Sequence, residues 1–509
     1  MSAVTRRGGA WGVSRWGPYV AGALAVLFFI LLSAAGQGPG FPLDDGWIHQ
    51  TYARNLAESG RLEFAPGTVS AGSTSPLWTL LLAPGHLLPL PDLWWPYMLG
   101  ALSLLFLMWA AMRVWRALWP AQEEHDWVAG GVLALSWPLV WAAGSGMETL
   151  FFIALGFMLL AHFLEGETGG IGLGLLAGLL ILARPEGVIL AALVAVALLM
   201  QKKWRKVGLY GVAALVPLIP YFIFNLTVSD VLWPNTFYAK QTEYAVLLTE
   251  PLPSRFLRLL FFSLGGPESG WRGVSGAHLL LAPGLVLGGW RALREDWTRR
   301  RLWRTVPLWW AGGHMLAYAI RLPVTYQHGR YLWAALPVWI LFGLAGWKAI
   351  LGQLRMQRRT GRMVGQVATM SFVVMLVLFL VFGAVAYTED VAFVENEMVD
   401  VALWLRENTP EEATIAAHDI GALGYFARRP ILDLAGLVSP QVIPMLQDEE
   451  ALARYVRGSN AQYLVTAPGW PYETLTSAAD VQLLYDTGYE WTRHQGLNNM
   501  AVYALPGGR

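Results

Sequence analysis

The sequence predicts an α-helical protein that crosses a membrane many times and ends in a small α/β domain. Of its 509 residues, 55% are apolar and 14% are charged, whereas about 25% of residues are charged in a soluble domain. Several apolar runs reach 18 residues or more, which is enough to cross about 30 Å of hydrocarbon. Residues 388–509 are more polar and alternate helical and strand patterns. These observations predict a membrane body over residues 1–387 and a separate domain after it.

Cysteine and net charge narrow the function classes. The sequence has no cysteine, which excludes disulfides, thiolate metal sites and cysteine catalysis. The formal net charge is +1 and no basic block occurs. We therefore expect no nucleic-acid partner.

Eleven apolar runs are interpreted as spans. The first, Tyr19–Leu32, follows Arg6, Arg7 and Arg15; it resembles a secretory signal with a faint twin-arginine motif, but we interpret it as an uncleaved span. Ser75–Leu90 is apolar but short and ends in Pro89-Leu-Pro91, so we expect an interfacial or re-entrant helix there. The other ten runs lie near residues 93–118, 127–144, 147–164, 170–184, 186–200, 207–226, 276–290, 305–321, 330–349 and 363–387.

The positions of basic residues predict the orientation. Eleven spans put four basic clusters on the side of the N-terminus, as cytoplasmic loops require: Arg113 with Arg116, Lys202–Lys206, Arg291–Arg304 and Lys348–Arg362. The N-terminus is then cytoplasmic and the chain is a multi-pass protein of the cell membrane. The first external loop covers residues 41–90, and the extracytoplasmic domain covers residues 388–509. In that domain we predict a helix at Glu397–Glu407 and strands near Thr414–Ala417, Tyr463–Thr466 and Met500–Ala504.

The first external loop carries an acidic pair. Asp44 and Asp45 open an amphipathic helix that is predicted to end near Gly60, and Asp is a favoured N-cap. The apolar stripe Ile48, Tyr52 and Leu56 leaves His49, Arg54 and Glu58 off it, which predicts a helix on the membrane surface. Adjacent helical residues point about 100° apart, so only one of the two carboxylates can face a substrate atom. The simpler alternative is a cap and its solvated neighbour.

Further polar residues fall on the predicted outer side. Ionisable groups at membrane depth are functional candidates, and three of these are cations where few are expected. Each also has a structural alternative: Arg184 and Glu186 pair with each other, Arg330 and Lys240 reach lipid phosphates, and Glu148 interacts with a helix dipole. The set comprises Glu148, Arg184, Glu186, Asn235, Lys240, His328, Arg330 and Tyr331.

Cations and one carboxylate in an outer cavity suit a lipid-linked phosphate substrate. Arg and Lys bind the phosphate and stabilise the charge that grows as it leaves. Only the attacking hydroxyl needs a base, and one carboxylate can contribute about 10²–10⁴-fold. A single displacement inverts the sugar carbon, whereas glycosidases need two carboxylates about 5–9 Å apart.

Short motifs along nearly the whole chain carry a family resemblance. They are Asp44-Asp45, Tyr52-Ala-Arg-Asn-Leu56, Pro66-Gly67, Gly72-Ser-Thr-Ser-Pro-Leu-Trp78, Ser145-Gly-Met-Glu148, Ala183-Arg-Pro-Glu-Gly187, Pro234-Asn-Thr236 with Lys240, His328-Gly-Arg-Tyr331, Asp419-Ile-Gly421, Gly424-Tyr425 and Asp433-Leu-Ala-Gly436. With them the chain resembles the GT-C superfamily of polyprenyl-phosphate-sugar glycosyltransferases. The closer resemblance is to the branch of the mycobacterial terminal arabinofuranosyltransferase and its uncharacterised bacterial relatives. It implies a polyprenyl-phosphate donor and an acidic base in the first loop, which we place on Asp44 with Asp45 as the alternate. Ala65 stands where the pattern predicts Asn.

The predicted function is therefore an inverting glycosyltransferase that acts on a cell-envelope glycan, lipid or protein. Arg330, Lys240 and Arg184 are expected to bind the donor phosphate. Glu148, Asn235, His328, Tyr331, Arg54 and Glu186 are the expected sugar or acceptor contacts. We expect no cofactor, since no carboxylate spacing indicates a divalent metal. The alternatives are a transporter or flippase of a lipid-linked sugar, which needs polar residues at midplane, and a non-catalytic assembly protein.

Overall fold

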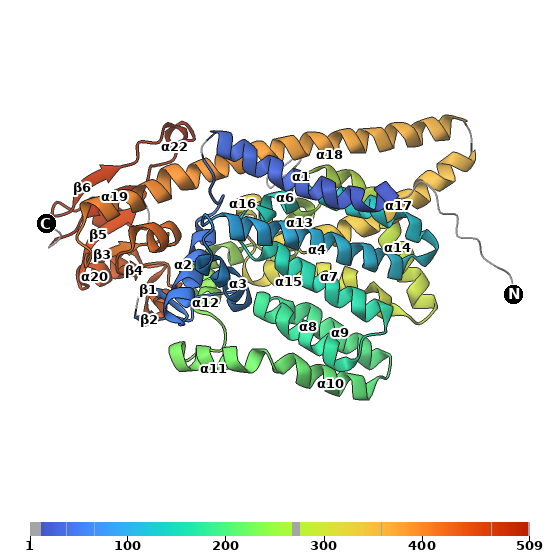
Figure 1. The fold of residues 1–509 in the computed structure, drawn as a ribbon, viewed down its shortest axis with the longest axis horizontal. Helices are drawn as coiled ribbons and strands as arrows, with labels where there is room; N and C mark the ends of the chain where they lie inside the picture. Colours follow the sequence, from blue (N-terminus) through green and yellow to red (C-terminus); the bar gives the residue numbers. More distant parts are fainter. Residues whose placement is uncertain are drawn as a thin grey trace.

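The computed structural model describes residues 12–506 apart from residues 37, 66, 267–274, 358 and 470. The predicted signal residues Arg6 and Arg7 lie outside this part. Helices running along the long axis form a body, and a domain with a β-sheet lies at one end of it (Figure 1). The predicted class, a helical membrane protein with a small C-terminal α/β region, is confirmed.

The body has a helix at each predicted apolar run. The described helices that are long and apolar enough to cross a membrane number four, or up to six if each of two bent pairs is one span. The bends are 66° between residues 120–134 and 137–143, and 42° between residues 204–215 and 218–229. The helices of the body are α1 (Gly12–Gly36), α4 (Trp94–Leu118), α5 (Asp126–Ala134), α6 (Trp137–Ala143), α7 (Thr149–Glu165), α8 (Gly170–Ala183), α9 (Gly187–Met200), α10 (Trp204–Leu215), α11 (Leu218–Ser229), α13 (Leu252–Ser263), α14 (Ala282–Thr298), α15 (Val306–Arg321), α17 (Leu336–Gln357) and α18 (Arg359–Phe393). The count of eleven spans stays a prediction.

Close helix contacts in the body depend on small residues. Gly284 lies on α14 and Gly346 on α17, at a close contact of these two helices. A Cβ on either glycine would overlap backbone atoms of the other helix. Without a hydrophobic force between helices in lipid, such close approach is what stabilises their packing. Large side chains such as Trp141, Phe152 and Trp310 fill the remaining core.

Short elements lie between the body and the C-terminal domain (Figure 1). They are α2 (Asp44–Ser59), β1 (Glu63–Ala65), β2 (Thr68–Val69), α3 (Pro76–Leu82), the 3₁₀ turn η1 (Ala83–Leu87) and α12 (Asn235–Glu243). The helix predicted to end near Gly60 is confirmed as α2, and the segment predicted to hold an interfacial helix forms α3 and η1.

Two predictions about α2 are wrong. The N-cap position is Leu43, with no side-chain cap bond, and Asp44 is the first helical residue. The helix also does not lie on the membrane surface as an open amphipathic helix, because His49 and Arg54, which are off the predicted apolar stripe, are buried. Elements distant in sequence cover both sides of α2, and the local periodicity of the chain does not reveal them.

The C-terminal domain holds a five-stranded sheet in the order β4-β3-β5-β7-β6. Strands β3 (Thr414–Ala417), β4 (Ile431–Asp433) and β5 (Ala461–Thr466) are parallel, while β7 (Ala501–Ala504) is antiparallel to β5 and to β6 (Gln482–Asp486). The three predicted strands are β3, β5 and β7. The prediction missed β4, which is short, and β6, whose residues are mostly exposed. Helices α19 (Asp400–Asn408), α20 (Glu449–Arg457), α21 (Glu473–Thr476) and α22 (Glu490–His494) accompany the sheet.

One long helix joins the body to this domain. It runs from Arg359 to Asn408 and includes a π-helical turn, η7 (Val394–Val399), so it passes without a break through the predicted boundary at residues 387 and 388. The fully buried carboxylate of Glu397 in this turn accepts hydrogen bonds from the Thr492 hydroxyl at 2.5 Å and the Met500 backbone N–H at 2.8 Å. These bonds anchor the sheet to the end of the helix.

Candidate active site

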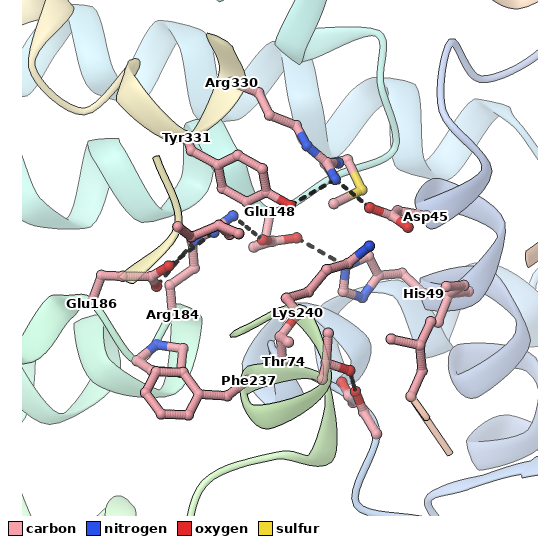
Figure 2. A pocket seen from close by; sticks show the side chains of 18 of the residues that line it. Asp45, His49, Thr74, Glu148, Arg184, Glu186, Phe237, Lys240, Arg330 and Tyr331 are labelled. Atoms are coloured by element: carbon pink, nitrogen blue, oxygen red, sulfur yellow. Dashed lines mark hydrogen bonds and ion pairs between the residues drawn. The ribbon is translucent and has the colours of Figure 1, made fainter. Parts of the chain in front are cut away.

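A cleft lies where the short elements between the body and the C-terminal domain meet the body, and it contains about 1140 Å³ of space including its open part. Helices α2, α12 and α15 line it, together with the short 3₁₀ helix η6 (Arg330–Leu332) and the loops that precede α7 and α9. The C-terminal domain adds Leu437 and Val438. Among the predicted site residues, the cleft brings together Asp45, Glu148, Arg184, Glu186, Lys240, Arg330 and Tyr331 (Figure 2).

Asp45 is the carboxylate that faces the cleft. It extends from the first turn of α2 and forms an ion pair with the Arg330 guanidinium (Figure 2). Burial alone would raise the pKa of Asp45, but the charges of Arg330 and then Lys240 outweigh burial and hold it at about 2. Asp45 is therefore ionised across the physiological range, in contact with a cation that is itself almost fully buried.

The backbone before Arg330 is unusual. Gln327, His328 and Gly329 have φ values of 52°, 58° and 70°, which place three successive residues in the left-handed region. For the two non-glycine residues this conformation costs of order 1–3 kcal/mol each and persists only where the surroundings impose it. The turn presents Arg330 to the cleft. The Nε and Nη1 atoms of Arg330 are buried and have no partner among the described residues, so they remain available to an anion.

His328 faces away from the cleft. Its Nε2 lies 2.7 Å from the Asp390 carboxylate of α18, and both residues line a second cavity next to Trp137. The structure therefore does not bring His328 together with the other predicted contacts. The same left-handed turn that presents Arg330 to one cavity turns His328 to the other.

Lys240 on α12 lies within reach of two acidic groups. Its Nζ is 3.5 Å from Glu243, and its charge lowers the pKa of Asp45. Glu243 is in turn 3.7 Å from His418 of the C-terminal domain. Asn235, the first residue of α12 and a predicted sugar or acceptor contact, is buried and is not among the residues that line the cleft, and neither of its side-chain polar atoms has a partner in the part of the chain that the structure describes. Its backbone N–H donates to Ala71, so Asn235 positions α12.

Glu148 is the centre of a second charged group. It is 1% exposed and accepts from Arg184 Nη1 at 2.7 Å, while its other oxygen lies 2.9 Å from His49 Nε2. Arg184 also pairs with Glu186 at 3.1 Å, so the predicted structural alternative for these two residues is present. Burial raises the pKa of Glu148, but the Arg184 and His49 charges hold it at about 2.

His49 was not among the predicted site residues. It lies four positions after Asp45 on α2, which puts both side chains on one helix face. That spacing was the available signal. The apolar stripe of α2 does not reveal it, because His49 lies off that stripe.

Asp44 and Arg54 contact the C-terminal domain instead of the cleft. Both Asp44 oxygens accept backbone N–H groups, from Gly421 and Ala422, at 2.7 Å each. Arg54 donates to the backbone oxygens of Gly424 and Tyr425 at 3.2 and 2.8 Å. One side of α2 thus holds the domain while another presents Asp45. Burial, and then the nearby Asp419 charge, raise the pKa of Asp44 to about 7 despite the two amide donors.

Replacing Asp44 by Asn is expected to weaken domain docking by about 1–3 kcal/mol, because an amide offers one acceptor where two N–H donors must be satisfied. A raised carboxyl pKa means that the folded state holds its proton more tightly, so the contribution of Asp44 to stability falls as pH rises from about 4 to about 7. Thermal unfolding at pH 5 and pH 8 measures both effects. Glu58→Gln, at an outward-facing position of α2, is the control. Unchanged melting at both pH values would contradict the docking role.

Comparisons with known proteins agree with this architecture. ArnT from Cupriavidus metallidurans in the apo state matches with a TM-score of 0.58 and 14% identity over 98% of this chain and 99% of that one. The same protein bound to undecaprenyl phosphate matches with a TM-score of 0.54 and 16% identity, over 97% of this chain and 98% of that one. The Archaeoglobus fulgidus oligosaccharyltransferase tethered to an acceptor peptide matches with a TM-score of 0.57 and 12% identity, over 90% of this chain and 70% of that one. At these identities the likeness shows a shared fold.

Sequence comparison adds one match. Residues 384–503 match a family model described as a domain of unknown function, DUF8728. No protein with a curated description matches the chain. The predicted fold is confirmed by the structural neighbours, which share it, while the arabinofuranosyltransferase branch stays a prediction.

Proposed function

We propose that this protein is a glycosyltransferase that moves a sugar from a polyprenyl-phosphate donor to a cell-envelope acceptor by a single inverting displacement. The observation that carries the proposal is the meeting of Asp45, Arg330 and Lys240 in one cleft, although they come from three distant parts of the chain. A carboxylate can act as the base in this chemistry, and two cations can stabilise the charge that develops on the leaving phosphate.

In the proposed step the acceptor oxygen attacks the anomeric carbon as the bond from that carbon to the phosphate oxygen breaks. Asp45 accepts the proton of the acceptor hydroxyl, and polyprenyl phosphate leaves with the bonding electrons. The unpartnered Nε and Nη1 of Arg330, with the Lys240 ammonium, bind the phosphate and stabilise its growing charge. This assigns the role of base to Asp45, the alternate of the sequence prediction.

The second charged group has a different proposed role. Arg184 already contacts two carboxylates, so it is less available to phosphate than Arg330. It holds Glu148 and Glu186 at the cleft wall, where these carboxylates can accept hydrogen bonds from sugar or acceptor hydroxyls. Tyr331, whose hydroxyl accepts from Arg330 at 3.1 Å, completes this wall.

The distribution of charge supports an outer location for the cleft. Helix α7 begins beside Glu148 at the cleft and ends at Glu165, which pairs with Arg113. Arg304 donates to the Leu118 carbonyl at 2.7 Å near that same end. At 1.5 Å per residue, α7 separates the two ends by about 25 Å. Basic residues thus gather opposite the cleft, as the proposed cytoplasmic side requires.

The similar structures support both a lipid-phosphate donor and a separate acceptor as substrates. One ArnT structure is described as bound to undecaprenyl phosphate, and the oligosaccharyltransferase is described as tethered to an acceptor peptide. In this chain the C-terminal domain contributes Leu437 and Val438 to the cleft, so we propose that it orients the acceptor.

The test uses the purified full chain in lipid nanodiscs with a panel of polyprenyl-phosphate pentoses and hexoses. Release of polyprenyl phosphate and transfer to membrane glycan or lipid acceptors are measured, with Asp45→Asn as the inactive control. We expect release with at least one donor and inversion at the sugar carbon. Movement of intact donors across vesicle membranes without any release would instead support the transporter alternative.

A further inference from the structure

We propose that Arg321 forms the entry site of this cleft, where the phosphate of a polyprenyl-phosphate lipid binds before it reaches Arg330 and Lys240. This inference deepens the proposed function and rests on it. It concerns a residue that ends α15 and that the sequence motifs do not include.

The first argument is the pairing of the cleft cations. Arg184, Lys240 and Arg330 each contact at least one carboxylate. Arg321 also lines the cleft, yet no carboxylate in the described ranges forms an ion pair with it; Glu186, which is already paired with Arg184, acts on it only from a longer distance. An anion that enters the cleft therefore meets in Arg321 a cation whose charge is not already neutralised.

The second argument is how Arg321 is held. Its guanidinium carbon lies 3.7 Å from the centre of the Phe237 ring, and its Nη2 donates to the Gln241 side-chain oxygen. Both partners are neutral side chains of α12. Stacking fixes the plane of the guanidinium while leaving edge donors free, and a phosphate binds a guanidinium more strongly than a neutral amide does. Gln241 is exposed, so it can be displaced at little cost.

The third argument is the position at the membrane. The turn of α15 before Arg321 presents Leu316 and Ile320, which are 41% and 50% exposed. In a membrane body, such exposed apolar side chains contact lipid tails. Arg321 therefore lies where a lipid-facing helix surface meets the cleft. A lipid whose chain lies along α15 would present its phosphate at this point.

The experiment measures binding of polyprenyl phosphate without a sugar to the full chain in zwitterionic nanodiscs. Arg321→Gln is expected to weaken binding about five- to ten-fold, as for one cation at a membrane surface. Arg321→Lys should recover part of the affinity, because it keeps the charge but loses the planar guanidinium that stacks on Phe237. The matched control is Arg61→Gln, an exposed arginine between α2 and β1 that does not line the cleft. It should bind like the wild type.

Phosphatidic acid is the comparison ligand, because it carries the same phosphate chemistry on an ordinary lipid. Equal affinity of wild type and Arg321→Gln for polyprenyl phosphate would overturn the inference. So would a loss confined to phosphatidic acid. In transfer assays Arg321→Gln should raise the KM for the donor and leave kcat nearly unchanged. A wild type that binds through Arg321 yet transfers no sugar would refute the proposed function alone, whereas transfer with an unaffected KM in the variant would refute this inference alone.

Discussion

Replacing Asp45 by Asn is expected to lower the rate of sugar transfer by about 10²–10⁴-fold, the contribution of one general base. The variant keeps the shape of the side chain and one acceptor oxygen for Arg330 but removes the negative charge beside it, so polyprenyl phosphate should bind at least as tightly as it binds to the wild type. Single-turnover transfer and equilibrium binding, measured on the same nanodisc preparation, separate these two quantities.

Asp44→Asn provides the comparison for this result. Asp44 contacts backbone N–H groups of the C-terminal domain and does not line the cleft. We therefore expect the Asp44 variant to lose stability but to retain most of its transfer rate where it is folded. The opposite pattern, an active Asp45→Asn and an inactive but folded Asp44→Asn, would return the role of base to Asp44.

Arg330→Gln is expected to lower the transfer rate by about 10²–10³-fold, because it removes the main donor to the leaving phosphate. It should also change the dependence of the rate on pH. In the wild type, Asp45 has a pKa of about 2 and stays ionised well below pH 5. Without Arg330, burial is opposed by fewer charges and raises this pKa, so Asp45 binds a proton at higher pH and the residual rate falls on acidification. Rates between pH 5 and pH 8 measure the shift.

The control for that experiment is Arg330→Lys, which keeps a cation beside Asp45. The transfer rate of this variant should depend on pH below neutrality much as the wild-type rate does. The rate itself falls, because an ammonium lacks the two parallel N–H donors of a guanidinium. Identical pH profiles in the Gln and Lys variants would mean that the charge of Arg330 does not control Asp45.

Local sequence signals predicted the short elements between the body and the C-terminal domain well where the interactions are local. The start of α2 at Asp44 and its end before Gly60 follow from helix periodicity and a glycine with φ of 72° at the C-terminus. The spacing of adjacent helical residues also predicted that only one carboxylate of the pair could work. It did not predict which one, because that depends on what covers each side of α2.

The sequence by itself determined the membrane body, the α/β tail, and a set of acidic and basic residues that separate to one predicted side. These features follow from hydropathy, from the spacing of apolar residues and from charge, which are properties of the chain before it folds. Only the tertiary structure decided that Asp45 and Arg330 meet, that Asp44 holds the C-terminal domain, and that His328 faces another cavity. The reason is physical: ion pairs such as Asp45 with Arg330 join residues 285 positions apart, and local pattern carries no information about contacts at that separation.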